Sequence, residues 1–220
     1  LGRNEATGRG VSITVREAAK KLGVNLKGAP IVVQGFGNAG QFAASLLEEM
    51  GMKVIAVSDS KGSIHKRDGL DIDSLRSHKL KNGTVAGFQG ASSIDDSDLL
   101  ELDCTVLVPA VKAKIVAEAA NGPTTPDADD ILFGNGVLVI PDILANGGGV
   151  TVSYFEWLQN LRREYWSEAE VNSRLDSNIS SAFNDVYNNH KEFNVNMRKA
   201  STLLAINRVV EAMKIRGLWP

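Results

Sequence analysis

The chain has 220 residues, of which 43% are hydrophobic and 23% are charged, and its 24 Lys and Arg nearly balance 26 Asp and Glu. This composition excludes intrinsic disorder, and the lack of a basic block argues against a nucleic-acid partner. Every apolar run is too short for a bilayer, the first residues are polar, and Cys104 is a single cysteine, so we expect no membrane partner and a cytoplasmic protein.

The first half of the chain alternates helices with short apolar strands. Apolar residues at helical spacing predict a helix over 7–22, which Gly23 ends. The β-branched runs at 31–34 and 53–58 predict buried strands, and a helix over 41–50 lies between them. This order of strand, glycine turn, helix and strand is the first half of a parallel crossover unit.

The middle of the chain is less regular. Over 60–103 we predict only a short helix at 98–101, with Ser97 as its N-terminal cap. Further strands are predicted at 105–108, 114–120 and 138–140. Because strands alternate with helices, we predict an α/β, Rossmann-like doubly wound fold with a mostly parallel sheet.

The last third is predicted to be helical. Asn146 and the glycines 147–149 open one helix, which is predicted to run from residue 150 to about residue 161. A second starts at Ser167, whose spacing to Glu170 is that of a capping box, and a third covers 197–216. A helical C-terminal tail therefore follows the sheet.

One connection conflicts with this topology. The predicted strands at 105–108 and 114–120 both have the character of parallel strands, but only a few residues separate them. Parallel neighbours need a crossover of about a dozen residues or more. Either one strand is assigned wrongly, or the chain lacks a segment that would form the crossover.

Three glycines fit the G-x-G-x-x-G spacing of dinucleotide-binding proteins. Gly35, Gly37 and Gly40 follow a predicted strand and open a predicted helix, which is the context that gives this pattern its meaning. The first makes the tight turn, the second lets the backbone approach a pyrophosphate, and the third lets helix and strand pack closely. We therefore predict dinucleotide binding rather than a turn that only packs a helix on a sheet.

Asp59 ends the second predicted strand, about 20 residues after the last of these glycines, where a carboxylate accepts hydrogen bonds from a ribose. A lone acid at this position favours NAD. Ser58, Ser60 and Lys61 could instead hold the 2′-phosphate of NADP. The sequence leaves NAD and NADP open, with a slight preference for NAD.

The remaining polar residues have plain interpretations when they are taken alone. The three histidines share no spacing and no acidic or cysteine partners, so no metal site is expected. Thr7 would be a helix cap, and Ser153 an ordinary helix serine.

Five longer segments resemble the C-terminal, cofactor-binding domain of hexameric glutamate dehydrogenases, in the family of glutamate, leucine, phenylalanine and valine dehydrogenases. In chain order they are GRNEATGRG at 2–10, VQGFGNAG at 33–40, VSDSKG at 57–62, AEAANGPTT at 117–125 and VTVSYFEW at 150–157. The resemblance covers essentially the whole chain.

The resemblance implies one dinucleotide-binding domain over 1–220. Its Rossmann core would cover 1–150, and its helical segment at 151–220 would pack back on a separate N-terminal substrate domain. No catalytic residue is expected in this chain, because the family's catalytic lysine and aspartate belong to that other domain. The family also has a longer stretch between the segments matched by Pro109 and Lys114, at the connection that is too short here.

The implied activity is the reversible oxidative deamination of L-glutamate to 2-oxoglutarate and ammonium, with NAD or NADP, in a homo-hexamer. Two alternatives stay open. The chain could be an isolated, non-catalytic nucleotide-binding module, or part of a dehydrogenase for leucine, valine or phenylalanine.

The resemblance also implies roles for single residues. Thr7 would contact the nicotinamide carboxamide, and Asn121 and Asn146 would lie at the nicotinamide end. Val150 and Ser153 would belong to the substrate pocket, where a hydroxyl suits a substrate carboxylate. The full set expected to contact the cofactor is Thr7, Gly35, Phe36, Gly37, Asn38, Ala39, Gly40, Asp59, Ser60, Asn121 and Asn146.

Overall fold

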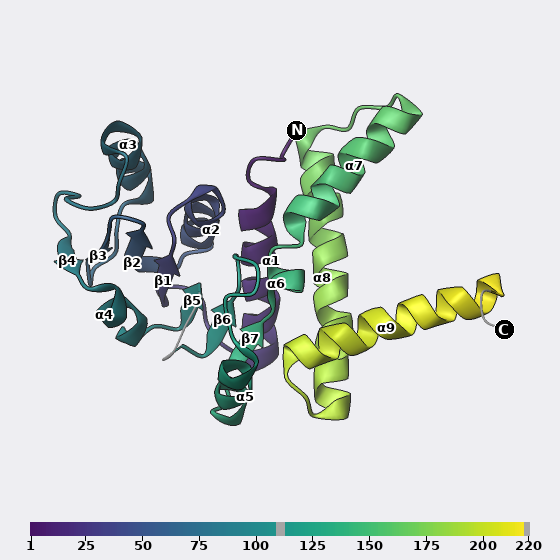
Figure 1. The fold of residues 1–220 in the computed structure, drawn as a ribbon. Coiled ribbons are helices and arrows are strands. Elements are labelled where there is room, and N and C mark those ends of the chain that lie inside the picture. Colours follow the sequence, from purple (N-terminus) through teal and green to yellow (C-terminus); the bar gives the residue numbers. More distant parts are fainter. Residues whose placement is uncertain (109–112, 218–220) are drawn as a thin grey trace.

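The computed structural model describes residues 1–108 and 113–217. Within them a seven-stranded sheet has the strand order β4-β3-β2-β1-β5-β6-β7 (Figure 1). Its parallel strands are β1 (Pro30–Gln34), β2 (Lys53–Asp59), β5 (Val106–Val108), β6 (Ile115–Ala117) and β7 (Leu138–Ile140). At one edge β3 (Gly62–His65) and β4 (Ser92–Ile94) pair in antiparallel fashion.

Helices cover both faces of the sheet, so the predicted α/β, doubly wound fold is confirmed. The bounds of the helices are α1 (Ala6–Leu22), α2 (Asn38–Glu49), α3 (Ile72–Asn82), α4 (Asp96–Glu101), α5 (Pro126–Gly134), α6 (Asp142–Ala145), α7 (Gly148–Arg162), α8 (Glu168–Phe193) and α9 (Met197–Arg216). None of the helices in this part of the chain combines the length and the apolar content that crossing a bilayer requires.

Successive residues of the central strands are buried in two different hydrophobic cores. Ile31 and Val33 of β1 are fully buried in the cluster that includes residues of α1, α2 and α8. Val32, between them, is buried in the other cluster with Leu99 of α4 and Leu132 of α5. Parallel strands that are buried on both faces have nearly continuous apolar sequences. This is why β1 and β2 could be predicted from the sequence.

Several local predictions need correction. Ser97 lies inside α4, whose N-cap is Asp95, and Thr7 lies inside α1, whose N-cap is Glu5. The strand predicted at 114–120 is shorter, because β6 runs only from Ile115 to Ala117 and the chain then turns away after the Glu118 N–H bonds to the Ile140 carbonyl oxygen. The edge strands β3 and β4 were not predicted.

The short connection joins two real strands. β5 and β6 pair in parallel, with Val106 opposite Ile115 and Leu107 opposite Val116. Both predicted strands therefore exist, although the second is shorter than predicted, and the alternative of a missing crossover segment remains. The connection itself, over 109–112, lies outside the described residues.

Of the last two helices, α8 packs against the core and α9 projects away from it. α8 begins with the predicted capping box of Ser167 and Glu170, and its apolar stripe packs against α1, which lies between α8 and the sheet (Figure 1). α9 starts beside β7 and projects away from the body of the molecule (Figure 1). Most of the large apolar side chains in its second half are exposed.

Candidate nucleotide-binding site

The glycine turn connects β1 to α2 and is held by the end of β2. Gly35 has a φ of 90°, in the left-handed region that favours glycine. The N–H groups of Gly35 and Phe36 donate to the Ser58 carbonyl oxygen at 3.1 and 2.6 Å. A Cβ on Gly40 would lie 1.9 Å from the Gly35 carbonyl oxygen, so only glycine lets the first turn of α2 approach this closely.

The N-terminus of α2 is open to a ligand. Its N-cap, Gly37, has no side chain to accept hydrogen bonds from the first helical turn, which is formed by Asn38, Ala39 and Gly40. The N–H groups of such a turn and the helix dipole attract phosphate. The sequence order of strand, turn and helix that the motif requires is therefore present.

A cleft of about 480 Å³ lies at this turn, at the carboxyl ends of the parallel strands. In doubly wound folds ligands bind there, where the strand order reverses, which in this sheet is between β1 and β5. The lining residues are Gln34, Gly35, Phe36, Gly37, Ser58, Asp59, Ser60, Lys79, Asp96, Ala120 and Pro123. A larger, polar cleft of about 740 Å³ between α1, α2 and α8 shares none of them.

The carboxylate of Asp59 is already engaged by the protein. Its side chain is 5% exposed and forms an ion pair with Lys79 at 3.0 Å. Oδ1 accepts from the Lys61 N–H at 2.9 Å and the Thr84 hydroxyl at 3.1 Å, and Oδ2 also accepts from the Val85 N–H at 2.8 Å. The ribose role of Asp59 stays a prediction, and the carboxylate holds the 79–85 segment against the end of β2.

These contacts set the charge state of Asp59. Burial by itself would raise the pKa of its carboxyl group, but the hydrogen bonds from Lys61, Lys79 and Val85 outweigh it and lower that pKa below its ordinary value. The Lys79 ammonium also lies 5.8 Å from the centre of the Phe36 ring. Sequence reasoning did not find Lys79 or Thr84, because neither stands in a motif or near Asp59 in the chain.

The two asparagines predicted at the nicotinamide end meet each other. Asn121 follows β6, and Asn146 is the C-terminal cap of α6. The Asn146 side-chain amide donates to Asn121 Oδ1 at 2.7 Å and to the Ala119 carbonyl oxygen at 3.3 Å. Ala120, next to Asn121, lines the cleft.

Glycines bring Thr7 to the same region. A Cβ on Gly148 would lie 2.0 Å from the Ala6 carbonyl oxygen, and a Cβ on Gly149 would lie 2.7 Å from Thr7 Oγ1. The N-terminus of α7 therefore touches the first turn of α1. This contact explains why residues 148 and 149 are both glycine.

The two predicted substrate residues lie on α7. Val150 is 72% exposed. The hydroxyl of Ser153 donates to the Gly149 carbonyl oxygen at 3.0 Å, within its own helix. Tyr154 and Trp157, on the same helix, are also about half exposed. The described residues leave this face of α7 open, and the roles of Val150 and Ser153 stay predictions.

Comparison with curated proteins shows long and close similarity. The chain is 49% identical to a glutamate dehydrogenase from Thermotoga maritima over all of its own length and 56% of that protein. It is 44% identical to an NAD-specific glutamate dehydrogenase from Staphylococcus aureus, over 98% of the chain and 55% of that protein. The chain thus spans about half the length of these relatives.

The alignment with the Thermotoga protein is longer than this chain. It is 233 residues long and covers all of this chain of 220. The relative therefore has residues with no counterpart in this chain.

Solved structures have the same fold. A hetero-hexameric glutamate dehydrogenase from Thermus thermophilus, in a leucine-bound form, matches with a TM-score of 0.91 and 32% identity, over 99% of this chain and 55% of its own. A glutamate dehydrogenase from Peptoniphilus asaccharolyticus matches with a TM-score of 0.84 and 38% identity, over 99% and 54%. The sequence model of the Glutamate/Leucine/Phenylalanine/Valine dehydrogenase family matches residues 1–217. The chain belongs to this family of amino-acid dehydrogenases.

Proposed function

We propose that this chain is the NAD(P)-binding half of a glutamate dehydrogenase. The observation that carries the proposal is the glycine turn at the open cleft on the carboxyl edge of the sheet, in a chain of this family. The names of the relatives that are 44–49% identical favour glutamate as the substrate. The whole protein would convert L-glutamate to 2-oxoglutarate and ammonium, reversibly.

Each part of the cleft suits one part of the dinucleotide. The turn from Gly35 to Gly40 and the N-terminus of α2 would hold the pyrophosphate. Asp59 and Ser60, beside Lys79, would lie at the adenosine ribose. Either NAD or NADP fits this proposal. NAD is preferred because the Asp59 carboxylate repels a 2′-phosphate, although Lys79 offsets part of its charge.

The nicotinamide end would lie where α1, α6 and α7 meet. Thr7, Asn121 and Asn146 would orient the ring and its ribose, and the bound nicotinamide supplies the hydride acceptor. Orienting the ring against the substrate carbon is the chain's own contribution to the rate. The lysine and aspartate that transfer protons would come from the substrate domain.

The exposed face of α7 would form one wall of the substrate site. Val150 and Ser153 would face the substrate side chain, and the Ser153 hydroxyl would turn from Gly149 to a carboxylate. A buried carboxylate needs such a donor, whereas an aliphatic or aromatic side chain does not. Ser153 therefore favours glutamate over leucine, valine and phenylalanine.

The exposed apolar residues of α9 also favour contact with a separate substrate domain. They are Leu203, Ile206, Val209, Val210 and Ile215. Apolar surface of this extent on a projecting helix marks an interface. We propose that α9 packs on the protein's own substrate domain, and that the complete protein is a homo-hexamer in the cytoplasm.

The test is oxidation of NADH and of NADPH by the full-length protein with ammonium and 2-oxoglutarate. We expect turnover with at least one cofactor, and turnover at least tenfold lower when the 2-oxo acid of leucine, valine or phenylalanine replaces 2-oxoglutarate. Faster turnover of one of those acids would reassign the substrate. No turnover with any of them would favour a non-catalytic nucleotide-binding module.

A further inference from the structure

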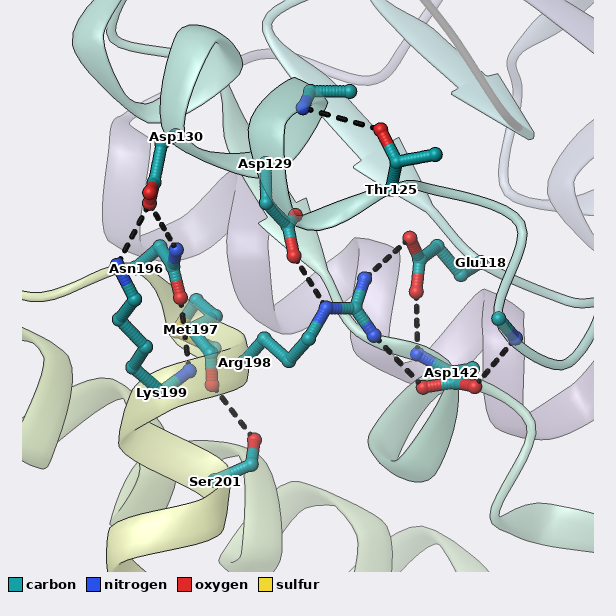
Figure 2. A network of polar contacts seen from close by, with 12 residues as sticks. Glu118, Thr125, Asp129, Asp130, Asp142, Asn196, Met197, Arg198, Lys199 and Ser201 are labelled. Carbon is teal, nitrogen blue, oxygen red and sulfur yellow. Dashed lines mark hydrogen bonds and ion pairs between the residues drawn. The ribbon is translucent and has the colours of Figure 1, made fainter.

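One guanidinium lies among three carboxylates where α9 meets the sheet (Figure 2). Arg198, in the first turn of α9, donates to Glu118 at 2.6 Å, to Asp142 at 3.0 Å and through Nε to Asp129. The carboxylates come from the end of β6, from α6 and from α5. Four elements far apart in the sequence thus meet at a single side chain.

Two of these carboxylates depend on Arg198 for their charge compensation. The side chains of Glu118 and Asp129 are 0% and 3% exposed, and that of Arg198 is 28% exposed. Among the described residues, Arg198 is the one cation within ion-pair distance of either. The second oxygen of Asp129 is buried with no hydrogen-bond partner in this part of the chain. Buried charges require such pairing.

The network continues from Arg198 to the segment that carries Asn121. The second oxygen of Glu118 accepts from the Asp142 N–H at 2.8 Å, and the second oxygen of Asp142 accepts from the Gly122 N–H at 2.8 Å (Figure 2). Both ends of the 118–122 segment are therefore fixed through side chains that bind Arg198. Ala120 and Pro123, in and after this segment, line the cleft.

Asn146 is linked to Asp142 through the backbone of α6. The Asn146 N–H donates to the Asp142 carbonyl oxygen at 2.9 Å, at the end of α6. Its side chain then donates to Asn121 Oδ1 at 2.7 Å. Arg198 itself does not line the cleft.

A separate set of contacts holds the start of α9. Lys199 pairs with Asp130 at 2.8 Å, and the Asn196 side chain donates to Asp130 at 3.2 Å (Figure 2). Asn196 also caps the helix by accepting from the Lys199 N–H. The attachment of α9 thus does not rest on Arg198 alone. Holding α9 in place therefore does not by itself explain why three buried or half-buried carboxylates gather around Arg198.

We infer that Arg198 is a positioning residue for the nicotinamide end of the cofactor, acting through Glu118 and Asp142 on Asn121 and Asn146. This inference rests on the proposed function. Loss of the Arg198 side chain should disturb the nicotinamide half of the site. It should leave the pyrophosphate turn intact, because the turn is held by Ser58 on the other side of the cleft.

The experiment compares ligands that do and do not contain nicotinamide. In the full-length protein we would measure dissociation constants for NADH and for ADP, which lacks the nicotinamide half, in Arg198→Gln and Arg198→Lys variants. We expect Arg198→Gln to weaken NADH binding at least tenfold and to change ADP binding less than twofold. Arg198→Lys keeps the charge and should recover part of the NADH affinity.

The control is Arg208→Gln, on the same helix. Arg208 pairs with Asp185 at 2.6 Å, and their side chains are 59% and 42% exposed. This variant should bind NADH and ADP as the unmodified protein does. If Arg208→Gln shows the same selective loss of NADH binding, the effect belongs to α9 in general and the inference is wrong.

A second variant covers the case in which Arg198→Gln does not fold. Asp142→Ala removes the carboxylate that accepts from the Gly122 N–H, and this side chain is 22% exposed. The variant should show the same selective loss of NADH binding. Equal effects on NADH and ADP, or no effect on either, would overturn the inference. Unmodified protein that binds neither NADH nor NADPH would instead refute the proposed function.

Discussion

Gly148→Ala should push apart α1 and α7, which meet where we propose that the nicotinamide binds. A Cβ on Gly148 would lie 2.0 Å from the Ala6 carbonyl oxygen and 3.1 Å from Gly10 Cα. Ordinary contact begins at 3.4 Å, and both obstacles are backbone atoms of α1. The helices would therefore have to move apart by roughly 1 Å or more, which is overpacking without a flexible side chain to yield.

The cost follows from that geometry. Overpacking typically costs about 1–3 kcal/mol, and a backbone obstacle places Gly148→Ala at the upper end, about 3 kcal/mol. For a unit of this size the melting temperature would fall by about 6–12 °C. Because Thr7 and Asn146 flank the contact, turnover should fall as well.

The assay is thermal unfolding of the full-length protein, with Gly134→Ala as the matched control. Gly134 is the last residue of α5, and a Cβ there would meet nothing within 4 Å. That variant should be as stable as the parent or up to about 1 kcal/mol more stable. A Gly148→Ala melting temperature within about 2 °C of the parent would refute the close α1–α7 contact.

Three further predictions concern single side chains. Folding lowers the pKa of Asp59 below its usual 3.8, so its contribution is fully present above that pH and is lost as the pH falls through the folded-state pKa. Asp59→Asn should therefore flatten the acid limb of a urea-midpoint profile below about pH 4, and an unchanged slope there would contradict this assignment. Ser153→Ala should raise the KM for 2-oxoglutarate about tenfold or more, the loss expected for one hydrogen bond to a charged group, and leave the NADH dissociation constant unchanged. An equal change in both would remove Ser153 from the substrate site. Burial, with a smaller effect of Asp103, raises the pKa of the Cys104 thiol to about 12, so iodoacetamide at pH 8 should leave the native protein unlabelled by mass spectrometry. Rapid labelling would mean that the side chain is accessible.

The elements with local signals could be predicted from the sequence. The glycine turn, α1 with its left-handed Gly23, and the capping box of α8 each depend on residues within a few positions of one another. β3 and β4 have four and three residues, and their pairing partners lie on other strands. Such short edge strands have no periodicity of their own to detect.

The candidate site was predicted only where motifs cover it. The turn from Gly35 to Gly40 lies where the pattern predicts it. The resemblance predicted Asn121 and Asn146 at one end of the site, and in the structure their side chains contact each other. Arg198 could not be found, because its three acidic partners are 56–80 residues away in the chain. The contacts of Asp59 were missed for a related reason, since Lys79 and Val85 reach it through the fold.

The most direct test of the central claim is a structure of the full-length protein with its reduced cofactor. We predict that the pyrophosphate lies on the turn from Gly35 to Gly40 and the nicotinamide beside Asn121 and Asn146. A nucleotide found instead in the larger polar cleft between α1, α2 and α8 would contradict the account, since that cleft shares no residue with the glycine turn.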